Sequence, residues 1–230
     1  QFSKEDFNKL LEMDYAERAC FILHRYLEEY DYNDLLNACK KAYGKFEDSD
    51  PAPLVKLDDK TFIMELFHGP TLAFKDVALT LLPYLLRKGC DISGVKQEVL
   101  ILVATRGDTG KAALEGNKDA QGIKIMVFYP NDGVSPMQKL QMTTQAGENV
   151  AVCAINGNFD DAQSGVKKIF TDKEVAAKLD ENGMMFSSAN SINWGRLVPQ
   201  IVYYISAYCD LIENGTIKNG DEINVVVPTG

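Results

Sequence analysis

The sequence predicts an α/β fold built from a mainly parallel sheet flanked by helices. From residue 98 onward, unbroken apolar runs of strand length alternate with segments of helical periodicity, as is typical of parallel strands covered by helices. The chain has 230 residues, 46% of them hydrophobic and 25% charged, which suffices for one large or two small domains. We expect residues 98–186 to form a smaller α/β subdomain. Residues 1–97 and 187–230 would form a larger, incomplete portion that includes N-terminal helices.

The first 45 residues predict a helical scaffold. Apolar side chains recur there at helical spacing, and two helix start signals stand among them, Ser3 with Asp6 and then Asn33. Short extended runs over residues 54–57 and 61–66 follow. We expect the helices over residues 4–12, 15–29 and 32–43.

Lys75 is the most informative single residue. The turn dipeptide Gly69-Pro70 ends an extended run, and an apolar helix follows, so Lys75 is expected in its first turn. Free backbone N–H groups and the helix dipole disfavour an ammonium there, and apolar neighbours would desolvate it, which favours the neutral nucleophile of a Schiff-base lysine. From spacing alone, a lysine that snorkels from a helix end is the better explanation. The expected apolar face comprises Val77, Leu81, Leu82 and Leu85.

A strand, a glycine turn and a helix follow one another after residue 98. The apolar strand Val99–Ala104 runs into Thr105-Arg106-Gly107-Asp108-Thr109-Gly110, and a helix is expected to begin near Lys111. Such a turn lets an anion contact free N–H groups of the helix. The spacing does not match a nucleotide triphosphate loop, so the turn alone is weak evidence for a binding site. Further strands are expected over residues 123–128 and 149–155, and further helices over 136–145, 160–170 and 174–179. Ser135-Pro136 marks the start of the first of these helices.

Polar residues crowd the start of a long amphipathic helix near the end of the chain. Short donors over residues 187–193 precede Arg196, which stands one turn into the helix. Hydroxyls, amides, free N–H groups and one bidentate cation suit a phosphate. A helix cap with a surface arginine explains the same pattern equally well. The expected apolar face comprises Leu197, Val198, Ile201, Tyr204, Ile205 and Tyr208.

Composition narrows the class of protein. The 24 basic and 33 acidic residues give a net charge of -9, which argues against nucleic acid or an anionic membrane as a partner. No apolar run reaches the roughly 20 residues of a membrane span, and the beginning of the chain lacks a signal-peptide pattern. Five scattered cysteines without C-x-x-C spacing are expected to be reduced thiols in a cytoplasmic protein.

The segment His68–Asp76, HGPTLAFKD, resembles the signature of the threonine synthase family. The stretches 104–116, 134–147 and 187–204 support the resemblance. It implies the type II fold of pyridoxal 5′-phosphate (PLP) enzymes, which is similar to the β subunit of tryptophan synthase. It also implies a carbon–oxygen lyase that converts O-phospho-L-homoserine and water to L-threonine and phosphate, the last step of threonine biosynthesis. Lys75 would be the catalytic residue and would hold PLP.

The resemblance also implies roles for individual residues. The loop 105–110 is similar to the family's Thr-Ser-Gly-Asp-Thr-Gly loop, and Arg106 stands where the family usually has serine, placing a long cation in a crowded site. Arg196 would contact the substrate phosphate, which argues against another type II lyase such as a threonine or serine dehydratase. The cofactor-binding residues would be Lys75, Phe74, Asp108, Thr229 and Gly230, and the substrate-binding residues Thr105, Gly107, Thr109, Asn190, Ser191 and Arg196; no metal ligand is implied.

The ends of the sequence suggest a piece of a longer enzyme. The chain begins with Gln1, and it ends at Thr229-Gly230 after an expected strand over residues 224–227. By the resemblance, the loop that holds the PLP phosphate continues from that Thr-Gly pair. We therefore expect a catalytically silent piece that binds PLP weakly or not at all, as an alternative to an active enzyme, and the sequence leaves the oligomeric state open.

Overall fold

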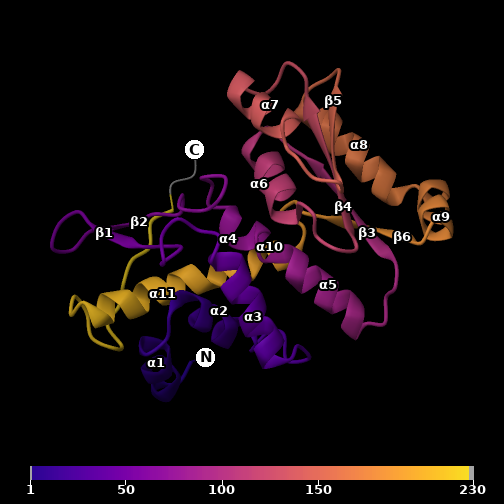
Figure 1. The fold of residues 1–230 in the computed structure, drawn as a ribbon. Helices are drawn as coiled ribbons and strands as arrows, with labels where there is room; N and C mark the ends of the chain where they lie inside the picture. Colours follow the sequence, from indigo (N-terminus) through magenta and orange to yellow (C-terminus); the bar gives the residue numbers. More distant parts are fainter. Residues whose placement is uncertain (1, 228–230) are drawn as a thin grey trace.

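The computed structural model describes residues 2–227 of the chain. A four-stranded parallel sheet with helices on both faces lies on one side of the molecule, and a helical region lies on the other (Figure 1). This arrangement confirms the predicted α/β fold with a parallel sheet. The strand order is β5-β4-β3-β6, formed by β3 (Glu98–Ala104), β4 (Ile123–Pro130), β5 (Val150–Ile155) and β6 (Met184–Ser188).

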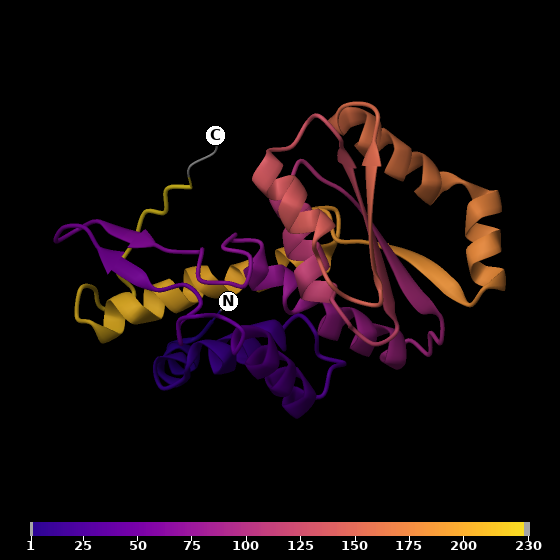
Figure 2. The ribbon, with the colours of Figure 1, turned by 45° about the horizontal axis from the view of Figure 1, so that its top comes forward.

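Strand β3 occupies a central position because its side chains are apolar on both faces. Ile101 and Val103 are fully buried in the core beneath α5, α6 and α7, whereas Leu102 and Ala104 pack with α8 on the opposite face. Figure 2 shows α6 and α7 on one face of the sheet and α8 on the other. The helices of this unit are α5 (Leu82–Ile92), α6 (Asp108–Asn117), α7 (Pro136–Thr143), α8 (Phe159–Thr171) and α9 (Lys173–Glu181).

The helical region has its own core. Leu10, Ile22 and Leu35 are nearly inaccessible to solvent and pack together with the long helix α11. A short antiparallel pair, β1 (Leu54–Lys56) with β2 (Phe62–Met64), extends from this region. Its helices are α1 (Lys4–Leu11), α2 (Tyr15–Leu23), α3 (Tyr32–Tyr43) and α11 (Pro199–Glu213), and the short helices α4 (Asp76–Leu79) and α10 (Trp194–Leu197) lie between this region and the sheet.

Two predicted start signals are confirmed and a third is wrong. Ser3 and Asp6 form a capping box at α1, and Ser135 forms one at α7 with proline in the first turn. Asn33 does not cap α3. Its backbone N–H is instead one of two that donate to the side chain of Asp31, which is the N-cap.

Three helices are shorter than predicted. The helix expected to carry Lys75 in its first turn and Val77 to Leu85 on its apolar face divides into α4 and α5. The long helix expected to carry Arg196 one turn from its start divides into α10 and α11. Pro83 and Pro199 explain both breaks, because proline lacks an N–H and its ring clashes with the preceding turn. α2 ends at Leu23 instead of residue 29, and the chain then turns so that the Tyr30 hydroxyl donates to the Leu85 carbonyl at 2.8 Å.

Strand β6 was absent from the predictions. Its sequence, Met-Met-Phe-Ser-Ser, has no β-branched residue and no clean alternation, so neither strand signal was present. Pairing with β3, in which Leu102 lies opposite Ser188, makes it a strand. β6 crosses the boundary expected between residues 186 and 187, so the predicted subdomain 98–186 and the predicted larger portion share one sheet. The residue ranges of these two portions stay a prediction.

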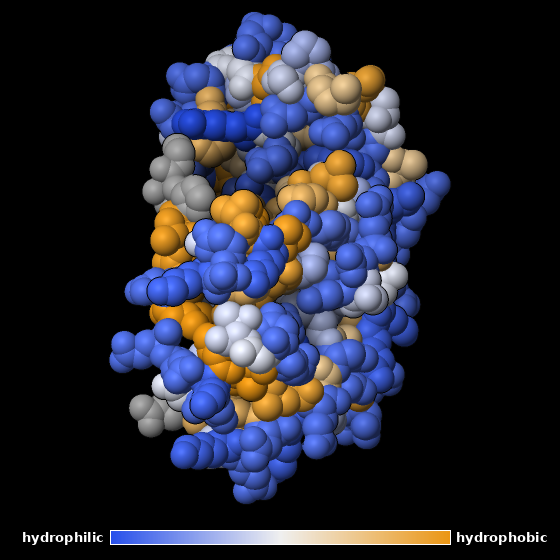
Figure 3. Space-filling view, turned by 90° about the vertical axis from the view of Figure 1, so that its left-hand side faces the viewer, coloured by the Kyte–Doolittle hydropathy of each residue, from blue (hydrophilic) through white to orange (hydrophobic). Residues whose placement is uncertain are grey.

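The predicted strand over residues 224–227 is wrong. These residues pair with no strand among residues 2–227, and the three valines of the segment are 52%, 87% and 59% exposed. A strand needs a neighbour for its backbone N–H and C=O groups, which the valine pattern alone cannot supply. Apolar side chains gather on the face that carries β1 and β2 (Figure 3).

Among residues 2–227, no helix combines the length and apolar character needed to cross a bilayer. The same residues contain no cluster of three His, Cys, Asp or Glu side chains placed to hold a metal ion.

Candidate active site

The candidate site lies at the carboxyl edge of the parallel sheet. Strands β3 and β6 are neighbours there, so the loops that follow them lie side by side. The Asn190 side chain connects them, because its Nδ2 donates to the Ala104 carbonyl at 3.1 Å. Ligands of open α/β sheets bind outside the carboxyl ends of the strands, which makes this edge the expected place for a site.

Lys75 occupies the N-cap position of α4 and reaches toward the loop after β3. Its Nζ lies 2.5 Å from Oδ2 of Asp108, and its side chain is only 13% exposed. The same Nζ lies 4.5 Å from the centroid of the Phe74 ring, an attractive position for a cation. The apolar neighbours of Lys75 in the sequence do not reveal this counter-charge, because Asp108 lies 33 residues further along the chain.

Asp108 is the first residue of α6. Partial burial would raise the pKa of its carboxyl, but the hydrogen bond and charge of Lys75 outweigh that effect, so the pKa lies below its usual value. The backbone N–H of Thr109 also donates to Oδ1 of Asp108 at 2.8 Å. Asp108 is therefore ionised at neutral pH and available as the partner of an ammonium.

Buried Asp76 fixes the loop that carries Lys75. It is 1% exposed and accepts hydrogen bonds from the Thr71 backbone N–H at 2.7 Å and the Thr71 hydroxyl at 2.6 Å. Burial raises the pKa of the Asp76 carboxyl, and the hydrogen bonds from Thr71 oppose that rise. A Cβ on Gly69 would lie 2.4 Å from the Asp76 Cβ, so only glycine fits there. Thr71 was not among the predicted site residues, because a separation of five residues from Asp76 matches no local capping pattern.

Hydrogen bonds from backbone N–H groups to the Thr105 side chain fix the shape of the loop after β3. Thr105 is 1% exposed, and its hydroxyl accepts hydrogen bonds from the N–H groups of Gly107 and Gly110, both at 2.9 Å. Gly107 has φ 146°, and a Cβ there would lie 2.3 Å from the Gln138 side chain. Thr105 thus has a defined role inside the loop, while its contact with a substrate stays a prediction.

Arg106 does not place its cation where the sequence suggested. Its side chain is exposed, and its guanidinium carbon lies 4.5 Å from the centroid of the Phe159 ring at the start of α8. The expectation that this residue crowds the site is therefore wrong. The attraction between the guanidinium and the ring gives this side chain, which is longer than serine, a favourable position over Phe159.

Arg196 is a buried cation without a carboxylate partner. It is 8% exposed, donates from Nη1 to the Ala189 carbonyl at 3.3 Å, and forms no ion pair with any residue in the range 2–227. Burial lowers the pKa of its guanidinium, and the charge of Asp108 opposes that change. The alternative of a surface arginine is therefore wrong. The N–H groups of Arg196 that have no partner within the described part of the chain can therefore donate to an anion that enters the site.

The loop after β6 arranges the other polar residues. Asn193 caps α10 by accepting a hydrogen bond from the Gly195 N–H at 2.8 Å, and its side chain donates to the Ser188 carbonyl at 2.6 Å. It was not among the predicted site residues. Ser191 is exposed at the surface of the same loop. The two remaining predicted cofactor residues, Thr229 and Gly230, lie outside the described residues.

Solved structures of threonine synthases have the same fold as this chain. The parallel sheet with a lysine-bearing helix start at its carboxyl edge has the fold of PLP-dependent enzymes of type II. PLP-bound threonine synthase from Brucella melitensis superposes with a TM-score of 0.83 and 40% identity over 92% of this chain and 44% of that one. The yeast threonine synthase structure gives a TM-score of 0.82 and 34% identity. A diaminopropionate ammonia lyase from Escherichia coli, 15% identical with a TM-score of 0.53, shares the fold alone.

The chain is also similar in sequence to threonine synthases and threonine synthase-like proteins. Human threonine synthase-like 1 is 42% identical over 98% of this chain and 31% of its own length, and threonine synthase of Pseudomonas aeruginosa is 38% identical over 92% and 44%. No family model matches the chain. The chain is therefore homologous to part of the threonine synthases, and it spans less than half the length of these relatives.

Proposed function

We propose that this chain provides part of the active site of a threonine synthase. The reaction would convert O-phospho-L-homoserine and water to L-threonine and inorganic phosphate. The likeness to threonine synthases over nearly the whole chain supports this assignment. The observation that carries it is the Lys75 amine, 13% exposed and paired with Asp108 at the carboxyl edge of the sheet. A biosynthetic reaction of this kind also fits the cytoplasmic location proposed from the sequence.

The residues around Lys75 fit PLP. A primary amine that reaches the site is the group that binds an aldehyde, and the neighbouring Phe74 ring offers an apolar surface at 4.5 Å from that amine. PLP, when bound, supplies an electron sink for carbanion chemistry at the substrate. Lys75 would hold its aldehyde carbon, and Asp108 would lie near the ring substituents.

Each side chain then has a distinct task. The Lys75 Nζ would take the proton from the substrate α-carbon and return protons as the γ-phosphate leaves and water adds at the β-carbon. Asp108 would stabilise the ammonium that Lys75 becomes after it takes a proton. Arg196, with Asn190 and Ser191, would bind the substrate phosphate, because its donors are buried and lack a carboxylate partner. Gly107 and Thr109 would face the substrate carboxylate.

The test is to identify the lysine that holds PLP. The full chain is incubated with PLP, reduced with borohydride and digested, and the labelled peptide is sequenced by mass spectrometry. We expect the label on Lys75. Lys75→Arg keeps the charge opposite Asp108 and should abolish labelling, whereas Lys60→Arg in the exposed loop between β1 and β2 should not. A label on another lysine refutes the assignment, and no label at all supports the silent alternative.

A further inference from the structure

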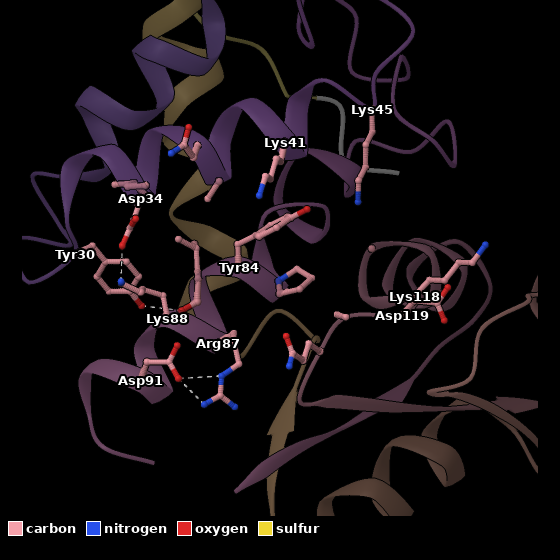
Figure 4. A pocket seen from close by; sticks show the side chains of 18 residues that line it. Tyr30, Asp34, Lys41, Lys45, Tyr84, Arg87, Lys88, Asp91, Lys118 and Asp119 are labelled. Atoms are coloured by element: carbon pink, nitrogen blue, oxygen red, sulfur yellow. Dashed lines mark hydrogen bonds and ion pairs between the residues drawn. The ribbon is translucent and has the colours of Figure 1, made fainter. Parts of the chain in front are cut away.

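A second cleft lies apart from the candidate active site. It encloses about 550 Å³ between α3, α5 and the segment that follows α6, and none of the predicted cofactor-binding or substrate-binding residues lines it. Small-molecule sites commonly enclose about 300–1,000 Å³, so a ligand of nucleotide size would fit. Figure 4 shows the side chains that line this cleft.

Two lysines of the cleft have unsatisfied charges. Lys41 and Lys45 form no ion pair with any residue in the described range 2–227. Two other cations of the cleft are neutralised: Lys88 Nζ lies 2.5 Å from Asp34, and Arg87 Nη2 lies 2.6 Å from Asp91. The whole chain carries a net charge of -9, so a cleft with free ammonium groups differs in sign from the rest of the surface.

Tyr84 adds a hydrogen-bond donor to the lining of the cleft. In Figure 4 the Lys41 and Lys45 side chains point toward the cavity, and the Tyr84 hydroxyl projects between them. Lys45 Nζ lies 6.0 Å from the centroid of the Tyr84 ring, and the Tyr84 hydroxyl makes no hydrogen bond within residues 2–227. Tyr30 differs, because its hydroxyl donates to the Leu85 carbonyl. The cleft therefore presents two ammonium groups and one phenol to an occupant.

The opposite wall of the cleft does not neutralise the charges of Lys41 and Lys45. Asp119 lies there, but its Oδ1 accepts a hydrogen bond from the Glu148 N–H at 3.1 Å, and its own N–H donates to Asn149 at 2.7 Å. Lys118, its neighbour, points its ammonium away from the centre of the cavity in Figure 4.

We propose that this cleft binds a phosphorylated small molecule. A phosphate dianion matches two ammonium groups and a phenol in both charge and hydrogen-bonding capacity, since its oxygens are acceptors and all three protein groups donate. The tyrosine ring and the cleft volume leave room for an attached organic part. This inference is independent of the proposed reaction, because it involves none of the residues assigned to that reaction.

Lysine footprinting tests the site directly on the full chain. The protein is acetylated briefly with and without AMP, and each lysine peptide is quantified by mass spectrometry. We expect AMP to protect Lys41 and Lys45 while Lys60, exposed in the loop between β1 and β2, keeps its reactivity. Adenosine, which lacks the phosphate, should protect neither. Equal protection by adenosine, or none by AMP, would overturn the proposal.

Charge reversal measures the strength of the site. The double variant Lys41→Glu/Lys45→Glu removes two charge-assisted contacts and adds two repulsive charges. It should weaken AMP binding by about 100-fold or more in equilibrium dialysis. Lys60→Glu makes a matched change outside the cleft and should leave the affinity unchanged. Arg196→Gln should also leave it unchanged, because the candidate active site is elsewhere. Loss of AMP binding in the Arg196 variant, with binding retained in the double variant, assigns the phosphate to that site and refutes ours.

Discussion

Two arginines are buried to a similar extent in this chain but have opposite surroundings. Arg18, 5% exposed in the helical region, lies 2.5 Å from both Asp210 and Glu213. It also donates to the Leu10 carbonyl at 2.9 Å. Arg196, 8% exposed beside the sheet, has one hydrogen bond to a carbonyl and no ion pair within residues 2–227.

The pKa shifts of the two guanidinium groups differ in direction. Burial lowers the pKa of both, but at Arg18 the hydrogen bond and charge of Asp210 outweigh burial and raise it. At Arg196 burial prevails, and Asp108 opposes it only in part. A buried cation with carboxylates on its donors stabilises the fold, whereas one without them retains its capacity for an incoming anion.

The largest expected effect comes from replacing the paired arginine, Arg18, and is on the free energy of unfolding. Arg18→Met leaves Asp210 and Glu213 without their cation, so we expect the free energy of unfolding to fall by about 3–5 kcal/mol in urea denaturation. Arg18→Met/Asp210→Leu should recover part of the loss, since the more buried carboxylate is removed with its partner. A loss below about 1 kcal/mol in the single variant would mean that the ion pairs contribute no more than surface pairs do.

The second effect is on substrate binding. Arg196→Lys keeps a charge but loses the planar pair of donors, and we expect it to weaken binding of O-phospho-L-homoserine by about 1.5–3 kcal/mol. PLP binding should be spared, and calorimetry with each ligand separates the two results. Unchanged affinity for the phosphorylated substrate would remove Arg196 from the site.

A third, smaller effect concerns the stability contributed by Arg196. Replacing an unpaired buried cation with an apolar side chain of similar size removes a desolvation cost and leaves no carboxylate behind. We expect Arg196→Met to change the free energy of unfolding by less than about 1 kcal/mol, or to raise it. A loss as large as that of Arg18→Met would show that the two arginines do not differ in kind.

The smallest effect is a dependence on pH. The pKa of Asp108 is lowered from 3.8, so its pairing with Lys75 stabilises the fold above pH 3.8, and the contribution is lost as pH falls toward the folded-state pKa. Its side chain is 54% exposed, so the amplitude should be below about 1 kcal/mol. At pH 6 wild type should therefore be more stable than Asp108→Asn. In acid below the folded-state pKa of Asp108, the two proteins should have the same stability. A difference that persists in acid would contradict the assignment to this carboxylate.

The sequence by itself determined the local features. An apolar run followed by Thr105-Arg106-Gly107 predicted a strand, a turn and a helix, and Ser135 with Pro136 predicted a helix start. The motif around Lys75 predicted the fold and the family. These features follow from backbone geometry and from periodicity over neighbouring residues, which are properties of a short window of sequence.

Only the tertiary structure decided which charges meet. Lys75 pairs with Asp108, 33 residues away, and Arg18 with Asp210, 192 residues away, so no local pattern distinguishes the paired arginine from the unpaired one. The same holds for Arg106, which lies over Phe159. Such pairings depend on burial and on distant partners, because the cost of an unpaired charge is set by the solvent and dipoles around it after the chain has folded.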